Sequence, residues 1–78
     1  MFKIEILSPS KSIFKGEADI VILPGQNGEF GIMTGHAPLL SNLKKGRIRV
    51  KTQGGEKTFQ IEGGFVEVDE KGVIVLSK

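Results

Sequence analysis

Residues 46–62 read GRIRVKTQGGEKTFQIE and contain the clearest hydrophobic pattern of the chain. From Arg47 to Lys51 apolar and basic residues alternate, which is the period of a β-strand with one buried face. Gln53-Gly54-Gly55-Glu56 supplies the glycines of a hairpin loop, and Thr58–Glu62 alternates again beyond it. The stretch therefore predicts two antiparallel strands joined by a short loop.

The same period of two extends toward both ends of the chain. Phe2–Leu7 alternates apolar and charged residues, Ala18–Leu23 becomes apolar on both faces toward its far end, and Val73–Leu76 reads as a short buried strand. Apolar residues change parity around Gly63-Gly64, which predicts a bulge or a strand bending between two sheets. Turn signals recur at intervals of about ten residues, a spacing typical of a β-sandwich or flattened barrel.

Residues 29–40, EFGIMTGHAPLL, do not fit this pattern. They are too apolar for a free loop and too rich in Gly and Pro for a regular element. Pro38–Leu43 is the best helical candidate in the chain, at one or two turns at most. One strand of a small sandwich has no room to bury all of these apolar side chains. Burial in the core explains each residue taken singly, whereas the segment as a whole predicts a protein–protein contact, for which the adaptable side chain of Met33 is well suited.

Length and composition limit the size and class of the protein. The chain has 78 residues, a net charge of +2 and 38% hydrophobic residues, which predicts one folded domain over residues 1–78 with a radius of gyration of about 11 Å. The absence of Cys excludes disulfides and thiolate sites. The longest apolar run, Ile20–Pro24, is far short of the roughly 20 residues of a membrane helix. No signal peptide is visible at the start, which predicts a soluble domain in a cytosol-like compartment.

Residues for catalysis are scarce. His36 is the only histidine, so a metal site with several imidazole ligands is excluded. Neither a nucleophile elbow nor a P-loop is present, and the glycines at 25, 28, 31 and 35 lack the G-x-G start of a dinucleotide fingerprint. We therefore expect no catalytic, cofactor-binding or metal-binding residue, and a protein that is not an enzyme.

The basic residues of the central hairpin leave one alternative open. Arg47, Arg49 and Lys51 project from one face of their strand, as a nucleic-acid-binding β-barrel would require. Such barrels usually add aromatic side chains on which bases stack, and this strand has none. A solvated outer face, or an edge strand protected by charge, explains the same pattern.

Several motifs, in order along the chain, resemble the epsilon-subunit family of F-type ATP synthases. They are Leu23-Pro24-Gly25-x-x-Gly28-Glu29-Phe30-Gly31-Ile32, Gly35-His36-Ala37-Pro38-Leu39-Leu40, Lys45-Gly46-Arg47-Ile48-Arg49, Gly63-Gly64-Phe65-Val66-Glu67-Val68 and Val73-Ile74-Val75-Leu76. The resemblance covers nearly the whole chain, and the second and fourth motifs together are highly specific.

The resemblance implies an all-β fold, a flattened ten-stranded β-sandwich in the central stalk of the synthase. It implies a non-catalytic rotor subunit without a cofactor, bound to the gamma subunit and to the membrane-embedded c-ring, that helps couple proton translocation to ATP synthesis. The residues that would contact the c-ring are Gln26, Asn27, Gly28 and Glu29, with the Glu29 carboxylate facing basic loops. Those that would contact gamma are Met33, His36, Ala37, Pro38 and Leu40.

The resemblance has a limit at the carboxy terminus. Family members usually continue into a two-helix hairpin with inhibitory and ATP-binding functions, whereas this sequence ends at Ser77-Lys78, so neither function is expected of these residues. Thr34 stands where the family commonly has Pro. Without a transit sequence, the expected location is the cytoplasmic face of a bacterial cell membrane, peripheral to it, with the chloroplast thylakoid as the alternative.

Overall fold

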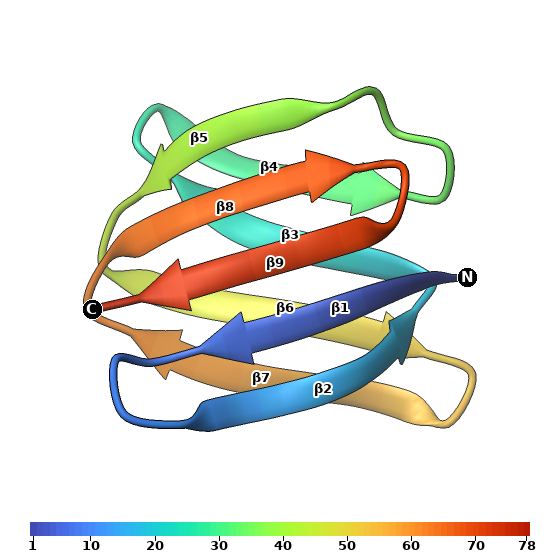
Figure 1. Ribbon diagram of the computed structural model, residues 1–78, viewed down its shortest axis with the longest axis horizontal. Helices are drawn as coiled ribbons and strands as arrows, with labels where there is room; N and C mark the ends of the chain where they lie inside the picture. The colour runs from blue at the N-terminus through green and yellow to red at the C-terminus, as the bar shows by residue number, and fades with distance from the viewer.

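The computed structural model describes residues 1–78 and contains strands, turns and bends but no helix (Figure 1). In chain order the nine strands are β1 (Phe2–Leu7), β2 (Ser12–Ala18), β3 (Ile20–Gly25), β4 (Gly28–Met33), β5 (Leu39–Leu43), β6 (Gly46–Thr52), β7 (Gly55–Ile61), β8 (Gly64–Asp69) and β9 (Gly72–Ser77). The all-β prediction is confirmed, and so is the central hairpin, whose loop narrows to Gln53 and Gly54.

The strands form two facing layers in Figure 1, with β1, β2, β5, β8 and β9 in front of β3, β4, β6 and β7. Their pairing order is β2-β1-β9-β8-β5-β3-β6-β7, and β4 pairs with β3 outside this path. The two layers are joined through β5 and β3 by a single residue pair, Gly25 with Leu43. Only β1 and β9 run parallel to each other; all other pairs are antiparallel.

The opposite side of the sandwich, between β2 and β7, is closed by side chains rather than by strand pairing. The rings of Phe14 and Phe59 lie 5.1 Å apart between centroids, and the Lys57 ammonium lies 5.3 Å from the Phe14 centroid. The barrel is therefore flattened and open, with an aromatic contact across its seam.

The interior is a cluster of 14 buried hydrophobic residues, most of them Ile and Val. The inward residues of the central hairpin, Ile48, Val50 and Ile61, belong to it, as do Ile4 and Ile6. β-branched side chains suit this pleated interior because their χ1 rotamers are restricted. The Cα radius of gyration is 11.1 Å, as the chain length predicts.

The structure has nine strands where the resemblance implied ten. The longest connection between strands is Thr34–Pro38, which does not pair as a strand. Pro38 lacks an amide hydrogen, and the His36 amide instead donates to the Met33 carbonyl oxygen at 3.1 Å, which closes a turn.

The helical candidate Pro38–Leu43 was wrong, and so was the expectation that residues 29–40 form no regular element. Residues 29–33 belong to β4, which pairs along its whole length with β3, residues 34–38 are a connection, and residues 39–40 begin β5. Leu39–Leu43 forms β5 and pairs residue by residue with Gly64–Val68 of β8. This alternation was hidden because Ser41 points inward and Leu40 outward, so the pattern of apolar residues does not follow the pattern of burial. Pairing with β8 outweighs the weak local preference of this short segment for a helix.

Two other strand predictions need correction. Ala18–Leu23 is not continuous: it breaks at Asp19, whose amide donates to the Lys51 carbonyl oxygen at 2.8 Å, as the chain passes from pairing with β1 to pairing with β6. Val73–Leu76 is buried on one face only, because Ile74 and Leu76 are exposed. The expectation that the far end of β3 is covered on both faces is confirmed, since Leu23, Pro24 and Gly25 are all buried.

The parity change at Gly63-Gly64 marks the point where the chain crosses between layers. The inward residues of β7, Phe59 and Ile61, have odd numbers, whereas those of β8, Val66 and Val68, have even numbers. Gly64 has φ of +151°, and an added Cβ would overlap the Leu76 carbonyl oxygen. Only glycine fits this crossing, as the predicted bend requires.

Candidate functional site

The hairpin connection between β3 and β4 carries the residues expected to meet the c-ring. Gly25 pairs with Gly28, leaving Gln26 and Asn27 at the tip. A Cβ on Gly25 would lie 2.7 Å from the Phe30 ring, and Gly28 has φ of +125°, so glycine is needed at both positions. Gln26, Asn27, Gly28 and Glu29 are all exposed, and we call these four residues the turn surface.

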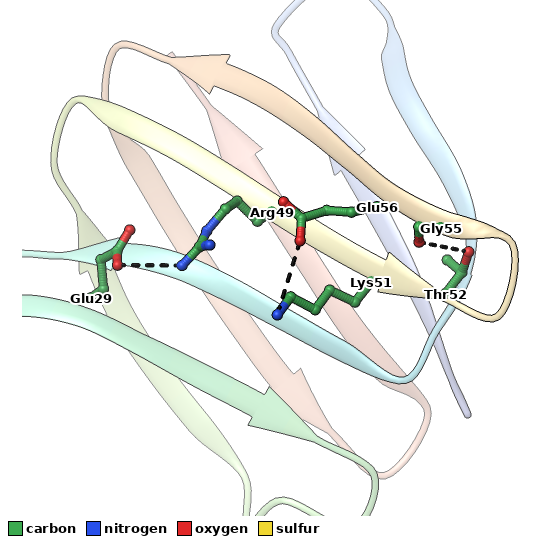
Figure 2. A network of polar contacts seen from close by, with 6 residues as sticks. All are labelled: Glu29, Arg49, Lys51, Thr52, Gly55 and Glu56. Atoms are coloured by element: carbon green, nitrogen blue, oxygen red, sulfur yellow. Dashed lines mark hydrogen bonds and ion pairs between the residues drawn. The ribbon is translucent and has the colours of Figure 1, made fainter.

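The Glu29 carboxylate already has a cation beside it within the chain. Its Oε1 lies 3.6 Å from an Arg49 guanidinium nitrogen, and Figure 2 shows this contact crossing over β3 from β4 to β6. The two side chains are 59% and 35% exposed, so the pair contributes little to stability and serves mainly to orient both groups.

The basic strand β6 is only partly free to meet an anion. Lys51 lies 3.9 Å from Glu56 on β7, shown in Figure 2, and Arg49 pairs with Glu29, whereas Arg47 is exposed with no carboxylate within ion-pair distance. No aromatic side chain lies beside these cations on β6, and the only cation–π contact is between Lys57 and Phe14. This arrangement matches a solvated outer face better than a stacking platform for bases.

Four of the five residues expected to meet gamma lie at the other end of β4 or in the connection that follows it, and the fifth, Leu40, lies in β5. Met33 and Leu40 are 60% and 65% exposed, and His36, Ala37 and Pro38 are exposed in the connection between β4 and β5. His36 Nδ1 lies 2.6 Å from the Ala37 carbonyl oxygen. We call these five residues the loop surface. Ile32, within the same apolar segment, is buried and belongs to the core.

The structure does not gather all five residues of the loop surface into one hollow. Met33 and His36 line a hollow of about 630 Å³ together with Met1 and Val68. Leu40 lies instead on the wall of another hollow, of about 540 Å³, together with the turn surface and Phe65. Leu40 is thus a boundary residue between the two predicted contacts.

Sequence reasoning missed an apolar patch on the outside of the front layer. Its register places Leu76 between Phe65 and Leu7, and Glu67 between Leu40 and Ile74, so one carboxylate interrupts the patch. Ile74 and Leu76 are 40% and 49% exposed. We call Leu7, Leu40, Phe65, Ile74 and Leu76 the outer apolar face. The signal was present in Val73–Leu76, because a strand that is apolar at every position has either two covered faces or one exposed apolar face.

The structure contains neither a metal-binding group of side chains nor a helix that could span a membrane. No three His, Cys, Asp or Glu side chains lie close enough to form a metal-binding group. The structure includes no helix with the length and hydropathy that a transmembrane span needs.

Comparison with known proteins assigns the family. The sequence profile described as "ATP synthase, Delta/Epsilon chain, beta-sandwich domain" matches residues 1–78. The chain belongs to this family. Family membership makes it a non-catalytic subunit domain of ATP synthase. It favours the resemblance to the epsilon-subunit family over the alternative of a nucleic-acid-binding barrel.

Named relatives support the same assignment within the epsilon chains. The ATP synthase epsilon chain of Chlorobium limicola is 49% identical over 78 residues, which cover 99% of this chain and 89% of the relative. That of Bradyrhizobium sp. (strain ORS 278) is 41% identical over 76 residues, which cover 97% of this chain but 56% of the relative. The chain therefore spans most of one epsilon chain and about half of the other.

Solved structures share the fold of this family member. A chain of the Euglena gracilis mitochondrial ATP synthase, solved as an OSCP/F1/c-ring assembly, matches with a TM-score of 0.89 and 25% identity over 97% of this chain and 49% of its own length. A chain of the Tetrahymena thermophila mitochondrial ATP synthase central stalk and c-ring matches with a TM-score of 0.80. At 15% identity, the second match supports the fold alone.

Proposed function

We propose that this chain is a rotor element of ATP synthase that binds the gamma subunit through the loop surface and the c-ring through the turn surface. It transmits rotation between these two partners and so couples proton translocation to ATP synthesis. Its place would be at the membrane surface, peripheral to the bilayer, on the cytoplasmic side of a bacterial cell or on a thylakoid.

The observation that carries the proposal is the exposure of large apolar side chains on an otherwise well-packed domain. Met33 and Leu40 are more exposed than any other large hydrophobic residue in the chain. Neither side chain contributes to the core, so a contact with another protein is the physical explanation for their apolar character. The outer apolar face continues from Leu40 and enlarges the surface available to that partner.

The rigidity of the domain suits this function. The turn surface and, apart from Leu40, the loop surface lie at the two ends of one strand, β4, which pairs along its whole length with β3 and buries Ile32 in the core. A closely packed β-layer resists deformation better than a flexible loop, so a force applied at one surface reaches the other.

The test is co-purification of the tagged chain with gamma and with the c-ring. We expect the parent chain to recover both, and the variant Met33→Asp to recover the ring but at least tenfold less gamma. Gln53→Asp is the matched control, because it places the same charge on the exposed turn between β6 and β7.

Three results would contradict the proposal. Recovery of neither partner by the parent chain would refute the rotor function, and equal recovery of gamma by all variants would refute the assignment of the loop surface. Recovery of nucleic acid with a steep dependence on salt would support the alternative barrel instead.

A further inference from the structure

The end of the sandwich that carries the Gln26–Asn27 turn also carries a group of cations on rigid backbone. The connection between β5 and β6, Lys44–Lys45, is held beside this turn because the Lys44 amide donates to the Pro24 carbonyl oxygen at 2.9 Å. Gly46 packs so closely that an added Cβ would lie 2.8 Å from the Cβ of Pro24. Figure 1 shows both connections at the end of the molecule where the C-terminus lies.

Positive charge exceeds negative charge around the turn surface. Lys45 lies 3.8 Å from Glu62, and Arg49 pairs with Glu29, the one acidic residue of the turn surface. Lys44 and Arg47 are exposed and have no carboxylate within ion-pair distance. We call Lys44, Lys45, Arg47 and Arg49 the cationic end. A surface that approaches the turn meets two free cations, Lys44 and Arg47, and a Glu29 whose charge is already compensated by Arg49.

The opposite end of the sandwich has a different charge balance. Its β8–β9 connection contains Glu70 and Lys71, and Asp69 accepts hydrogen bonds from the Lys71 and Gly72 amides at 2.8 and 3.2 Å. Asp19 lies at the break between β2 and β3. The same end holds the Lys51–Glu56 pair, since the Asp19 amide bonds the Lys51 carbonyl oxygen, so cations and carboxylates are more evenly balanced here than around the turn surface.

We propose that the cationic end, rather than the Glu29 carboxylate, determines which charge the c-ring must present, and that the ring surface facing it carries carboxylates. This inference rests on the proposed function, because it names the chemistry of the contact made at the turn surface. Fixed cations attract an acidic surface over several ångströms and repel a basic one, so they set both the rate and the orientation of binding. The role of Arg49 is then to keep Glu29 from repelling that surface.

The experiment measures binding of the parent chain and its variants to purified c-ring in uncharged detergent micelles, at low and high salt. We expect Lys44→Glu/Arg47→Glu to weaken binding at least tenfold at low salt and the parent affinity to fall as salt is added. The matched control, Lys15→Glu/Lys71→Glu, makes the same change of charge at exposed positions on β2 and in the β8–β9 connection, and should change affinity less than twofold. Circular dichroism melts confirm that each variant is folded.

A third variant and a second probe separate the remaining outcomes. Glu29→Gln should bind the ring as tightly as the parent or more tightly; a tenfold loss would overturn the inference and support Glu29 as the recognition group. Equal binding by Lys44→Glu/Arg47→Glu would also overturn it. Parent binding to phosphatidylglycerol vesicles as tight as to the ring would mean that lipid phosphate is the anion and would overturn the assignment to the ring. Failure of the parent chain to bind the ring at all would instead refute the proposed ring contact itself, and the inference with it.

Discussion

The two ends of β4 differ in chemistry and in construction. At its start, a two-residue turn fixed by Gly25 and Gly28 presents polar side chains among cations. At its end, the exposed Met33 leads into the longer Thr34–Pro38 connection, which contains no Lys, Arg, Asp or Glu and is held by one backbone turn. A six-residue strand spans about 17 Å. One short, fully paired strand thus separates the charged surroundings of the turn surface from the apolar side chain of Met33, so each end can be altered without the other.

The largest effect is expected from a substitution that loosens the core and thereby weakens both contacts. Ile48 is fully buried in β6, and Ile48→Ala leaves a cavity that should lower the free energy of unfolding by about 2–5 kcal/mol. Ile48→Val is the control, at about 0.5–1.5 kcal/mol. Urea titration measures the free energy of unfolding of both variants. If Ile48→Ala lowered it less than Ile48→Val, the core would relax around the cavity more readily than a domain that transmits torque should.

A smaller change should affect the start of β4 alone. Gly25→Ala places a Cβ 2.7 Å from the Phe30 ring and 2.8 Å from the Gly28 carbonyl oxygen, so the turn must shift, at about 1–3 kcal/mol. We expect capture of the c-ring to fall while capture of gamma by the folded variant persists. Equal loss of both would show that the ends of β4 are not independent.

The complementary change affects the end of β4. His36 is exposed and its ring contacts only the adjacent Ala37 carbonyl, so His36→Ala should alter the free energy of unfolding by less than about 0.5 kcal/mol. If His36 lies in the gamma contact, affinity for gamma should fall about fivefold, equivalent to about 1 kcal/mol. Titration calorimetry with gamma measures this, and unchanged affinity would remove His36 from the contact.

The smallest effect concerns the ion pair beside the turn. In a double-mutant cycle, Glu29→Gln and Arg49→Gln should show a coupling of at most about 1 kcal/mol, because both side chains are partly solvated. Thermal melts of the four proteins should give a coupling that vanishes in 1 M salt. A larger coupling that resists salt would indicate that the pair is structural and not merely orienting.

The sequence predicted the elements whose burial follows their hydrophobic pattern. The β6–β7 hairpin and the crossing at Gly63-Gly64 were foreseen because apolar residues alternate on one side and the glycines interrupt them. β5 was missed because Ser41 faces inward and Leu40 outward, so only the tertiary pairing with β8 reveals the strand.

The contacts with gamma and the c-ring stay predictions, although the residues named for them have the exposure that such contacts require. All nine proposed contact residues are exposed, because none of them contributes a side chain to the core. The pairing of Glu29 with Arg49 and the separation of Leu40 from His36 depend on which strands lie side by side. Local sequence carries no such information, and neither does it tell that Ile74 and Leu76 remain uncovered.

The most direct test of the account is whether the chain holds gamma and the c-ring at the same time. Purified c-ring is immobilised, and gamma is added with and without the parent chain. We predict that gamma is retained only when the chain is present, in amounts equal to the bound chain, and that Met33→Asp abolishes the retention of gamma while staying bound to the ring itself. If gamma instead displaced the chain from the ring, the two contacts would overlap, and a domain gripping both partners through opposite ends of β4 would be contradicted.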